Sequence, residues 1–196
     1  MVLKEGCRGL ARKAALDKDD GMSDPFPPDP VPANPFLTDI LPQLAGGAAH
    51  TRALGFRLDG VEGQTVRLCT PYRQDLVGDP ETGVLAGGLV TTMLDHIGGL
   101  AVWIAVGGYQ PIATLDLRVD YMRAARPRED LLAEAVCYKL TRNIAFVRAW
   151  AYETSTDDPV AAAQSAYVLS EAGQHRIGAN LRPRSPRPAP RQDDRA

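Results

Sequence analysis

The pattern of apolar positions changes its period along the first half of the chain. Apolar residues recur at helical spacing from 36 to about 50, and two short strand-like runs follow at 53–58 and 64–70. A loop rich in Pro, Gly and Asp at 77–83 then leads into an almost wholly apolar segment at 87–106. The pattern predicts a helix, a hairpin and a second, long helix.

After Gly107 and Gly108 the period becomes two, which is typical of a half-buried strand at 114–122. One face of this strand is expected to carry Leu115, Leu117, Val119 and Tyr121. Three further strand-like segments follow at 131–140, 144–153 and 160–169, joined by short polar turns as in an antiparallel meander. The order of elements indicates an α+β fold in which an antiparallel sheet wraps around one buried helix.

The two ends of the chain differ in composition from the region between them. Residues 1–33 mix charges with closely spaced prolines, and residues 182–196 alternate Arg with Pro. Neither segment has the apolar content to pack, so we expect two disordered extensions around one domain at 34–181. We interpret the arginines at 182–196 as part of a solvated tail. The alternative is that they contact an acidic ligand.

Charge and cysteine content narrow the class of protein. The net charge of −2 argues against a protein whose main role is nucleic-acid binding. Three widely spaced cysteines, Cys7, Cys69 and Cys137, fit free thiols in a reducing compartment, which predicts a cytoplasmic protein. The apolar segment 85–106 is interrupted by Asp95, His96 and four glycines, which favours a buried helix over a membrane span. No metal-ligand spacing is visible, and we expect neither metal nor cofactor.

The start of the long helix carries the strongest candidate chemistry. Gly87 and Gly88 leave backbone N–H groups unshielded at the positive end of the helix dipole, where an oxyanion can bind. Asp95 follows two turns later, and a carboxylate buried in an apolar segment is usually hydrogen-bonded, paired or used in chemistry. These two features together predict a site, with a purely structural role for Asp95 as the alternative.

Small residues surround Asp95 on its face of the helix. They are Thr91, Thr92, Gly98 and Gly99. Two glycines inside a helix each cost about 0.5–1 kcal/mol relative to Ala, so this face is expected to admit a ligand or a partner subunit. His96 lies about 100° around the helix, so a packed, hydrogen-bonded histidine is favoured over a catalytic Asp–His dyad.

Three segments of the chain resemble, in the same order along the sequence, three segments of one known protein family. Gly87, Gly88 and Asp95 have the spacing of a motif in which His-Gly-Gly opens a helix and a carboxylate follows two turns later. The segment 114–124 is similar to a strand that runs along the dimer interface of that family, and 141–146 is similar to its hairpin. Together they resemble the hotdog-fold thioesterases of the phenylacetic-acid-pathway (PaaI-like) type.

The resemblance implies an enzyme that hydrolyses a medium-chain or aromatic acyl-CoA. It implies that Asp95 is the base or nucleophile, that the Gly87 N–H is the oxyanion donor and that Thr114 contacts the attacking water. We expect Gly88, Thr91 and Thr92 to contact the substrate. A homodimer or homotetramer, with sites between subunits and with neither nucleic acid nor membrane as a partner, is also expected.

Two positions depart from the family pattern. The motif histidine is replaced by Ala86, and the loop position at which many relatives have asparagine corresponds to Asp79. The missing histidine keeps open the alternative of a non-catalytic acyl-CoA-binding protein. A hotdog enoyl-CoA hydratase or dehydratase is a second alternative, disfavoured because adjacent Asp95 and His96 do not reproduce the motif of those enzymes.

Overall fold

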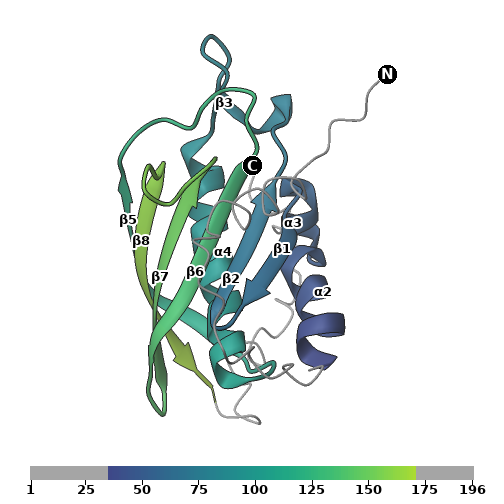
Figure 1. The fold of residues 1–196 in the computed structure, drawn as a ribbon, viewed down its shortest axis with the longest axis vertical. Helices are drawn as coiled ribbons and strands as arrows, with labels where there is room; N and C mark the ends of the chain where they lie inside the picture. Colours follow the sequence, from purple (N-terminus) through teal and green to yellow (C-terminus); the bar gives the residue numbers. More distant parts are fainter. Residues whose placement is uncertain (1–34, 171–196) are drawn as a thin grey trace, which may run out of the picture.

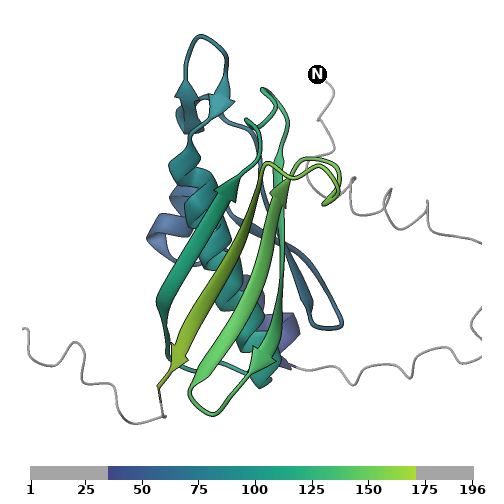
Figure 2. The ribbon, with the colours of Figure 1, turned by 90° about the vertical axis from the view of Figure 1, so that its left-hand side faces the viewer.

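The computed structural model of the chain describes residues 35–170, which form a six-stranded antiparallel sheet curved around one long helix, α4 (Gly87–Val106) (Figure 1). Seen from the side, the strands cross this helix obliquely (Figure 2). The predicted α+β fold, with a sheet wrapped around a central helix, is confirmed. The predicted extensions at 1–33 and 182–196 lie outside the described residues, as do both ends of the predicted domain.

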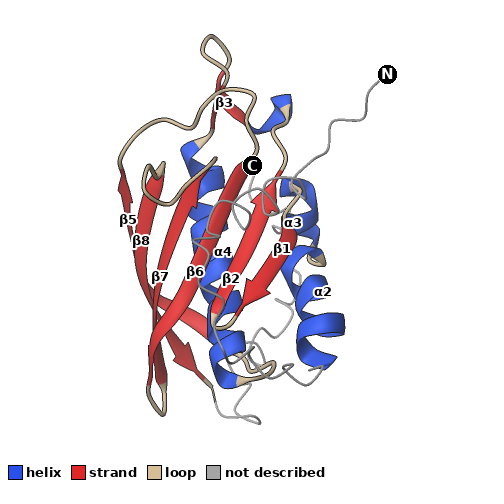
Figure 3. Ribbon diagram, in the orientation of Figure 1, coloured by secondary structure: helices blue, strands red, loops and turns tan. Residues whose placement is uncertain are grey.

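The predicted first helix is divided into shorter pieces. A π-helical turn at Phe36–Ile40 is followed by α2 (Leu41–Gly46) and α3 (Ala49–Leu54). Helix α3 ends at Gly55, whose φ of +76° is a left-handed conformation that glycine adopts without strain. The prediction that a strand begins at residue 53 is therefore wrong, because residues 53 and 54 are the last two residues of α3. Helix α2 packs against the first strand and against α4 (Figure 3).

The main sheet has the order β1-β2-β6-β7-β8-β5, so β1 and β5 are its edges. Its strands, in chain order, are β1 (Arg57–Glu62), β2 (Thr65–Thr70), β5 (Ile112–Tyr121), β6 (Leu131–Leu140), β7 (Ile144–Tyr152) and β8 (Ala161–Leu169). The loop before α4 contains a 3₁₀ turn at Gln74–Leu76 and a small hairpin of β3 (Val77–Asp79) and β4 (Val84–Leu85). All pairs in the main sheet are antiparallel. The meander expected from the short turns is confirmed for β6, β7 and β8, whereas the pairs β2–β6 and β5–β8 join strands that no short turn connects.

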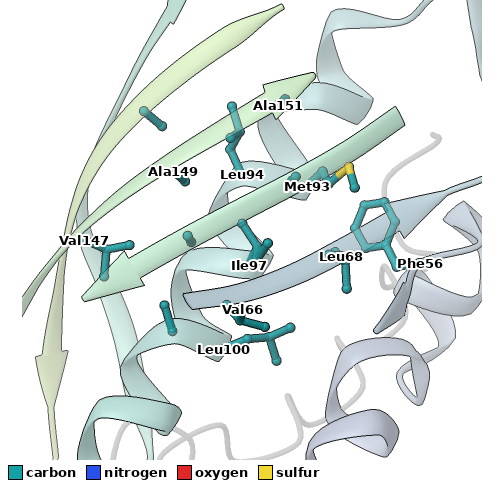
Figure 4. Packing of buried hydrophobic residues seen from close by; sticks show 14 of the residues in the cluster. Phe56, Val66, Leu68, Met93, Leu94, Ile97, Leu100, Val147, Ala149 and Ala151 are labelled. Atoms are coloured by element: carbon teal, nitrogen blue, oxygen red, sulfur yellow. The ribbon is translucent and has the colours of Figure 1, made fainter. Parts of the chain in front are cut away.

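The core lies between α4 and the concave face of the sheet. Helix residues Met93, Leu94, Ile97 and Leu100 are fully buried and face side chains of β2 and β7 (Figure 4). Many sheet residues beneath the helix are alanines, which lets the helix approach closely. By length and composition α4 is apolar enough to cross a membrane, but 56% of its most apolar window is buried inside the protein. This packing agrees with the predicted core helix.

Strand β5 contains a bulge that changes which side chains face α4. Thr114 pairs with Tyr167 and Asp116 pairs with Ala166, so Leu115 is an extra residue between them. The prediction that Leu115 shares a face with Leu117 is wrong, since Leu115 is 57% exposed. A strict alternation would turn Thr114 away from the helix, and the bulge brings it back to the helix side.

The cysteines differ from the expectation of free thiols. Cys69 is disulfide-bonded, whereas Cys137 is free. Cys69 is buried with Leu132 and Tyr152 in a small cluster separate from the main core. Sequence spacing alone does not reveal this bond, and cysteine usage no longer supports a reducing compartment.

Candidate active site

The start of α4 is open to solvent. Ala86 precedes the helix with an extended backbone, and Gly87 and Gly88 are both exposed. The hydrogen bonds of residues 35–170 include none donated by the Gly87 N–H. A Cβ added to Gly88 meets no atom within 4 Å. The first turn therefore presents an unpaired donor to open space, at the positive end of a helix dipole.

Asp95 and Thr114 meet although they lie on different elements. The Thr114 hydroxyl, from β5, donates a hydrogen bond of 2.8 Å to Oδ1 of Asp95, on α4. Asp95 is half-buried, so the expectation of an enclosed carboxylate is wrong. Within the described part of the chain Asp95 has no ion pair, and its second carboxylate oxygen, Oδ2, accepts no hydrogen bond. One oxygen is fixed and the other is available to a ligand or a water.

The threonines before Asp95 bond back to the first turn of the helix. The Thr92 hydroxyl donates to the Gly88 carbonyl over 2.8 Å, and the Thr91 hydroxyl donates to the Gly87 carbonyl over 3.3 Å. The Tyr121 hydroxyl also donates to the Gly87 carbonyl, over 2.6 Å. Sequence reasoning placed Tyr121 on the correct strand face but missed that it reaches this turn.

The helix glycines after Asp95 are covered by the chain itself. A Cβ on Gly98 would lie 2.1 Å from the Tyr167 hydroxyl, and a Cβ on Gly99 would lie 3.4 Å from a methyl group of Ile112. The expectation that these glycines admit a ligand or a partner subunit is therefore wrong. Gly98 makes room for Tyr167, whose hydroxyl donates to the Asp95 carbonyl over 2.8 Å.

His96 is a packed residue, as predicted. Its Nε2 lies 2.8 Å from the Ala45 carbonyl oxygen, and its ring stacks on Phe56. Burial lowers the pKa of His96, which keeps the ring neutral. With its ring directed to α2, His96 does not form a dyad with Asp95.

Ala86 and Asp79, the two positions that depart from the family motif, belong to neighbouring segments. Glycine at position 78 leaves room for Ala86, since a Cβ on Gly78 would lie 2.7 Å from the Ala86 Cα. The Asp79 carboxylate accepts hydrogen bonds from the Thr82 hydroxyl, at 2.6 Å, and from the Glu81 N–H, at 3.0 Å. These bonds lower the pKa of Asp79 and hold its side chain in its own turn.

No group of three or more potential metal ligands occurs in residues 35–170.

The fold is an antiparallel sheet wrapped around one helix. That helix begins with two glycines and carries a carboxylate two turns later, and known proteins share this arrangement. The family model for the thioesterase superfamily matches residues 82–157, a segment that contains Gly87, Asp95 and Thr114. A Pseudomonas aeruginosa protein of known structure is 32% identical, with a TM-score of 0.60 over 65% of this chain and 95% of that one. The chain belongs to the thioesterase superfamily and has the hotdog fold.

Other relatives extend the comparison. A thioesterase from Haemophilus influenzae is 20% identical with a TM-score of 0.61, over 69% of this chain and 92% of that one. A variant of the phenylacetic acid degradation protein PaaI from Thermus thermophilus is 22% identical with a TM-score of 0.53, over 62% and 98%. At these identities the likeness shows the fold alone.

A Halobacterium salinarum protein named as an esterase is 38% identical over 87 residues. The match covers 42% of this chain and 55% of the relative, so it spans about half of that protein.

Proposed function

We propose that this protein hydrolyses an acyl-CoA thioester, with a medium-chain or aromatic acyl group, to the free acid and CoA. Membership of the thioesterase superfamily supports a hydrolase. The observation that carries the proposal is the half-exposed Asp95 carboxylate, with one oxygen held by Thr114 and the other open. The exposed helix start at Gly87 adds a donor for the charge that develops on the thioester oxygen.

In the proposed reaction Asp95 removes a proton from a water that attacks the thioester carbonyl carbon. The Gly87 N–H binds the carbonyl oxygen as it becomes negative. The C–S bond then breaks, and the departing CoA thiolate takes up the proton that Asp95 removed from the water, which returns Asp95 to its starting form. Direct attack by Asp95, followed by hydrolysis of the resulting anhydride, uses the same groups. Gly88, Thr91 and Thr92, which lie between Gly87 and Asp95 on α4, are the proposed contacts to the substrate.

The spacing along α4 supports a site shared by two copies of the chain. Gly87 and Asp95 are eight residues apart, which is about 12 Å along a helix axis. An oxyanion donor and a base must each come within about 3 Å of groups at one carbonyl. We therefore propose a homodimer or homotetramer in which Gly87 of one copy and Asp95 of another act together. The edge strand β5, which has one unpaired side, supports this assembly.

A second candidate function is acyl-CoA binding without hydrolysis. It is favoured by Ala86, which offers no side-chain donor where the family motif has histidine. Loss of one oxyanion donor typically lowers the rate by about 10²–10³. On the first proposal this protein is thus a slow thioesterase, and on the second it binds acyl-CoA without hydrolysing it.

The test is a screen of purified full-length protein against straight-chain and aromatic acyl-CoAs. Release of free thiol is followed spectroscopically, and binding is measured in parallel by calorimetry. Thiol release that is proportional to enzyme concentration supports the thioesterase. Binding without thiol release supports the second candidate, and conversion of enoyl-CoA without thiol release supports a hydratase.

A further inference from the structure

Two tyrosine hydroxyls reach from the sheet to backbone carbonyls of α4. Tyr121, the last residue of β5, donates to the Gly87 carbonyl over 2.6 Å. Tyr167, on the neighbouring strand β8, donates to the Asp95 carbonyl over 2.8 Å. The two carbonyls thus contacted belong to the two residues at the centre of the proposed chemistry.

The Tyr121 bond fixes the first turn of the helix. The first turn has few restraints of its own, because Ala86 provides no side-chain cap and Gly87 and Gly88 are conformationally free. The Thr91 hydroxyl lies 2.7 Å from the Tyr121 hydroxyl, so both groups converge on the Gly87 carbonyl. Holding this carbonyl fixes the Gly87–Gly88 peptide group directly, and it restrains the Gly87 N–H, which belongs to the preceding peptide group, through the first turn.

The end of β5 is itself anchored, so Tyr121 is a fixed point and not a loose side chain. The Met122 N–H donates to the Val160 carbonyl over 2.9 Å. Arg123 forms an ion pair with the buried carboxylate of Glu153 on the far side of β8. These contacts tie the strand end to the rest of the sheet.

The Tyr167 bond fixes the helix at Asp95. Tyr167 is 2% exposed, and its hydroxyl occupies the space that a side chain at position 98 would take. A glycine inside a helix costs about 0.5–1 kcal/mol, and the approach of Tyr167 accounts for that cost. Burial raises the pKa of Tyr167, so the hydroxyl remains a donor.

We propose that Tyr121 and Tyr167 are positioning residues that hold the Gly87 N–H and the Asp95 carboxylate in the geometry required for thioester hydrolysis. This inference rests on the proposed function. Each tyrosine acts through a backbone carbonyl, so neither needs to contact the substrate. Displacement of a reacting group by a fraction of an ångström is costly in rate, whereas the binding of a long ligand tolerates it.

The test compares Tyr121→Phe and Tyr167→Phe, each of which removes one hydroxyl and keeps the ring. Tyr138→Phe is the control for Tyr121, because both tyrosines are 50% exposed. Tyr152→Phe is the control for Tyr167, because Tyr152 is only 7% exposed and its hydroxyl donates to Glu134. We measure kcat, KM and the midpoint of thermal unfolding for all four variants on the substrate with the highest wild-type rate.

We expect kcat to fall roughly ten-fold in Tyr121→Phe and in Tyr167→Phe, with KM unchanged. The two control variants should retain wild-type kcat, and the unfolding midpoint should show that all four variants remain folded at the assay temperature. Wild-type kcat in both test variants would overturn the inference while leaving the thioesterase intact. A rise in KM at constant kcat would instead make these hydroxyls substrate contacts. Absence of thiol release by the wild-type protein is a failure of the proposed function and is recorded separately.

Discussion

At the scale of single residues, the bond between Thr114 and Asp95 determines what the carboxylate can do. The Thr114 hydroxyl occupies Oδ1 at 2.8 Å, which fixes the rotation of the carboxylate. Oδ2 remains open on a half-exposed side chain, which is the arrangement that a base or nucleophile requires. No cation neutralises Asp95 within residues 35–170, so its charge is available at the site.

Ala86 gives the first prediction at this scale. Ala86→His restores the motif donor at the residue before Gly87, and kcat should rise on the order of ten-fold, since one oxyanion donor contributes about 10²–10³ in favourable cases. Ala86→Phe fills similar space without an N–H and serves as the control. Steady-state thiol release distinguishes the two variants. If histidine and phenylalanine have the same effect on kcat, the missing donor does not limit this enzyme.

The residues of the candidate site were identified from the sequence to different extents. Gly87 and Asp95 stand out because glycines and a carboxylate are unusual in an apolar helix, and their spacing is local. The contacts of Tyr121 and Tyr167 span 34 and 72 residues of sequence, and no local pattern encodes them. Sequence reasoning therefore found the residues of the helix and Thr114, which holds the Asp95 carboxylate, but not the two tyrosines that hold the helix backbone.

At the scale of elements, helix α4 and strand β5 are adapted to each other. The bulge at Leu115 returns Thr114 to the helix side, and Gly98 lets β8 approach through Tyr167. The helix itself was predicted with its observed bounds, because its apolar run and flanking glycines are local signals. The bulge was not predicted, because an unpaired residue is defined by the register with β8 and not by alternation within β5.

Gly98 and Gly99 are neighbours in α4 with different surroundings, so substituting each of them tests the role of Tyr167. Gly98→Ala should lower the free energy of unfolding by about 1–3 kcal/mol, because the new Cβ would lie 2.1 Å from the Tyr167 hydroxyl. Gly99→Ala should be neutral or stabilising by up to about 1 kcal/mol, because its Cβ would meet only the flexible end of Ile112, at 3.4 Å. Chemical denaturation of both variants provides the values. Equal effects at the two positions would mean that Tyr167 does not require a glycine at 98.

At the scale of the whole molecule, His96 joins the core helix to the N-terminal helices. Its ring bonds to the Ala45 carbonyl and stacks on Phe56, so α4 is linked to α2 and to the residue that precedes β1. Burial is the largest influence on the pKa of His96 and lowers it, while Asp95 and the Ala45 carbonyl act in the opposite direction. The neutral ring is therefore the form that the folded protein prefers.

This preference makes stability dependent on pH. The unfolded chain binds a proton at His96 near pH 6.5, whereas the folded chain resists it. The contribution of His96 to stability is complete above about pH 6.5 and is lost progressively as the pH falls below that value. His96→Gln should flatten the decline in the unfolding midpoint between about pH 6.5 and 5 relative to the wild-type protein. The same slope in His96→Gln and the wild-type protein would contradict this assignment.

The shared site gives a prediction about mixed assemblies. Gly87→Pro removes the proposed oxyanion N–H at the first helical position, where proline is tolerated. Asp95→Asn removes the proposed base. If Gly87 and Asp95 of different copies act together, refolding the two inactive variants as an equal mixture produces dimers with one intact site. Activity should then return to roughly a quarter of the wild-type value, by random pairing of copies. No recovery in mixtures shown to contain mixed dimers would place both groups within one chain.

The most direct test of the central claim is thiol release by Asp95→Asn relative to the wild-type protein. The substitution keeps the size of the side chain and an acceptor for Thr114 but removes the charge. Asp116→Asn, at an exposed position of β5, controls for the loss of one carboxylate. We predict that kcat falls by about 10²-fold or more in Asp95→Asn, with the unfolding midpoint and acyl-CoA affinity retained, and is unchanged in Asp116→Asn. Wild-type turnover by a well-folded Asp95→Asn variant would contradict the account.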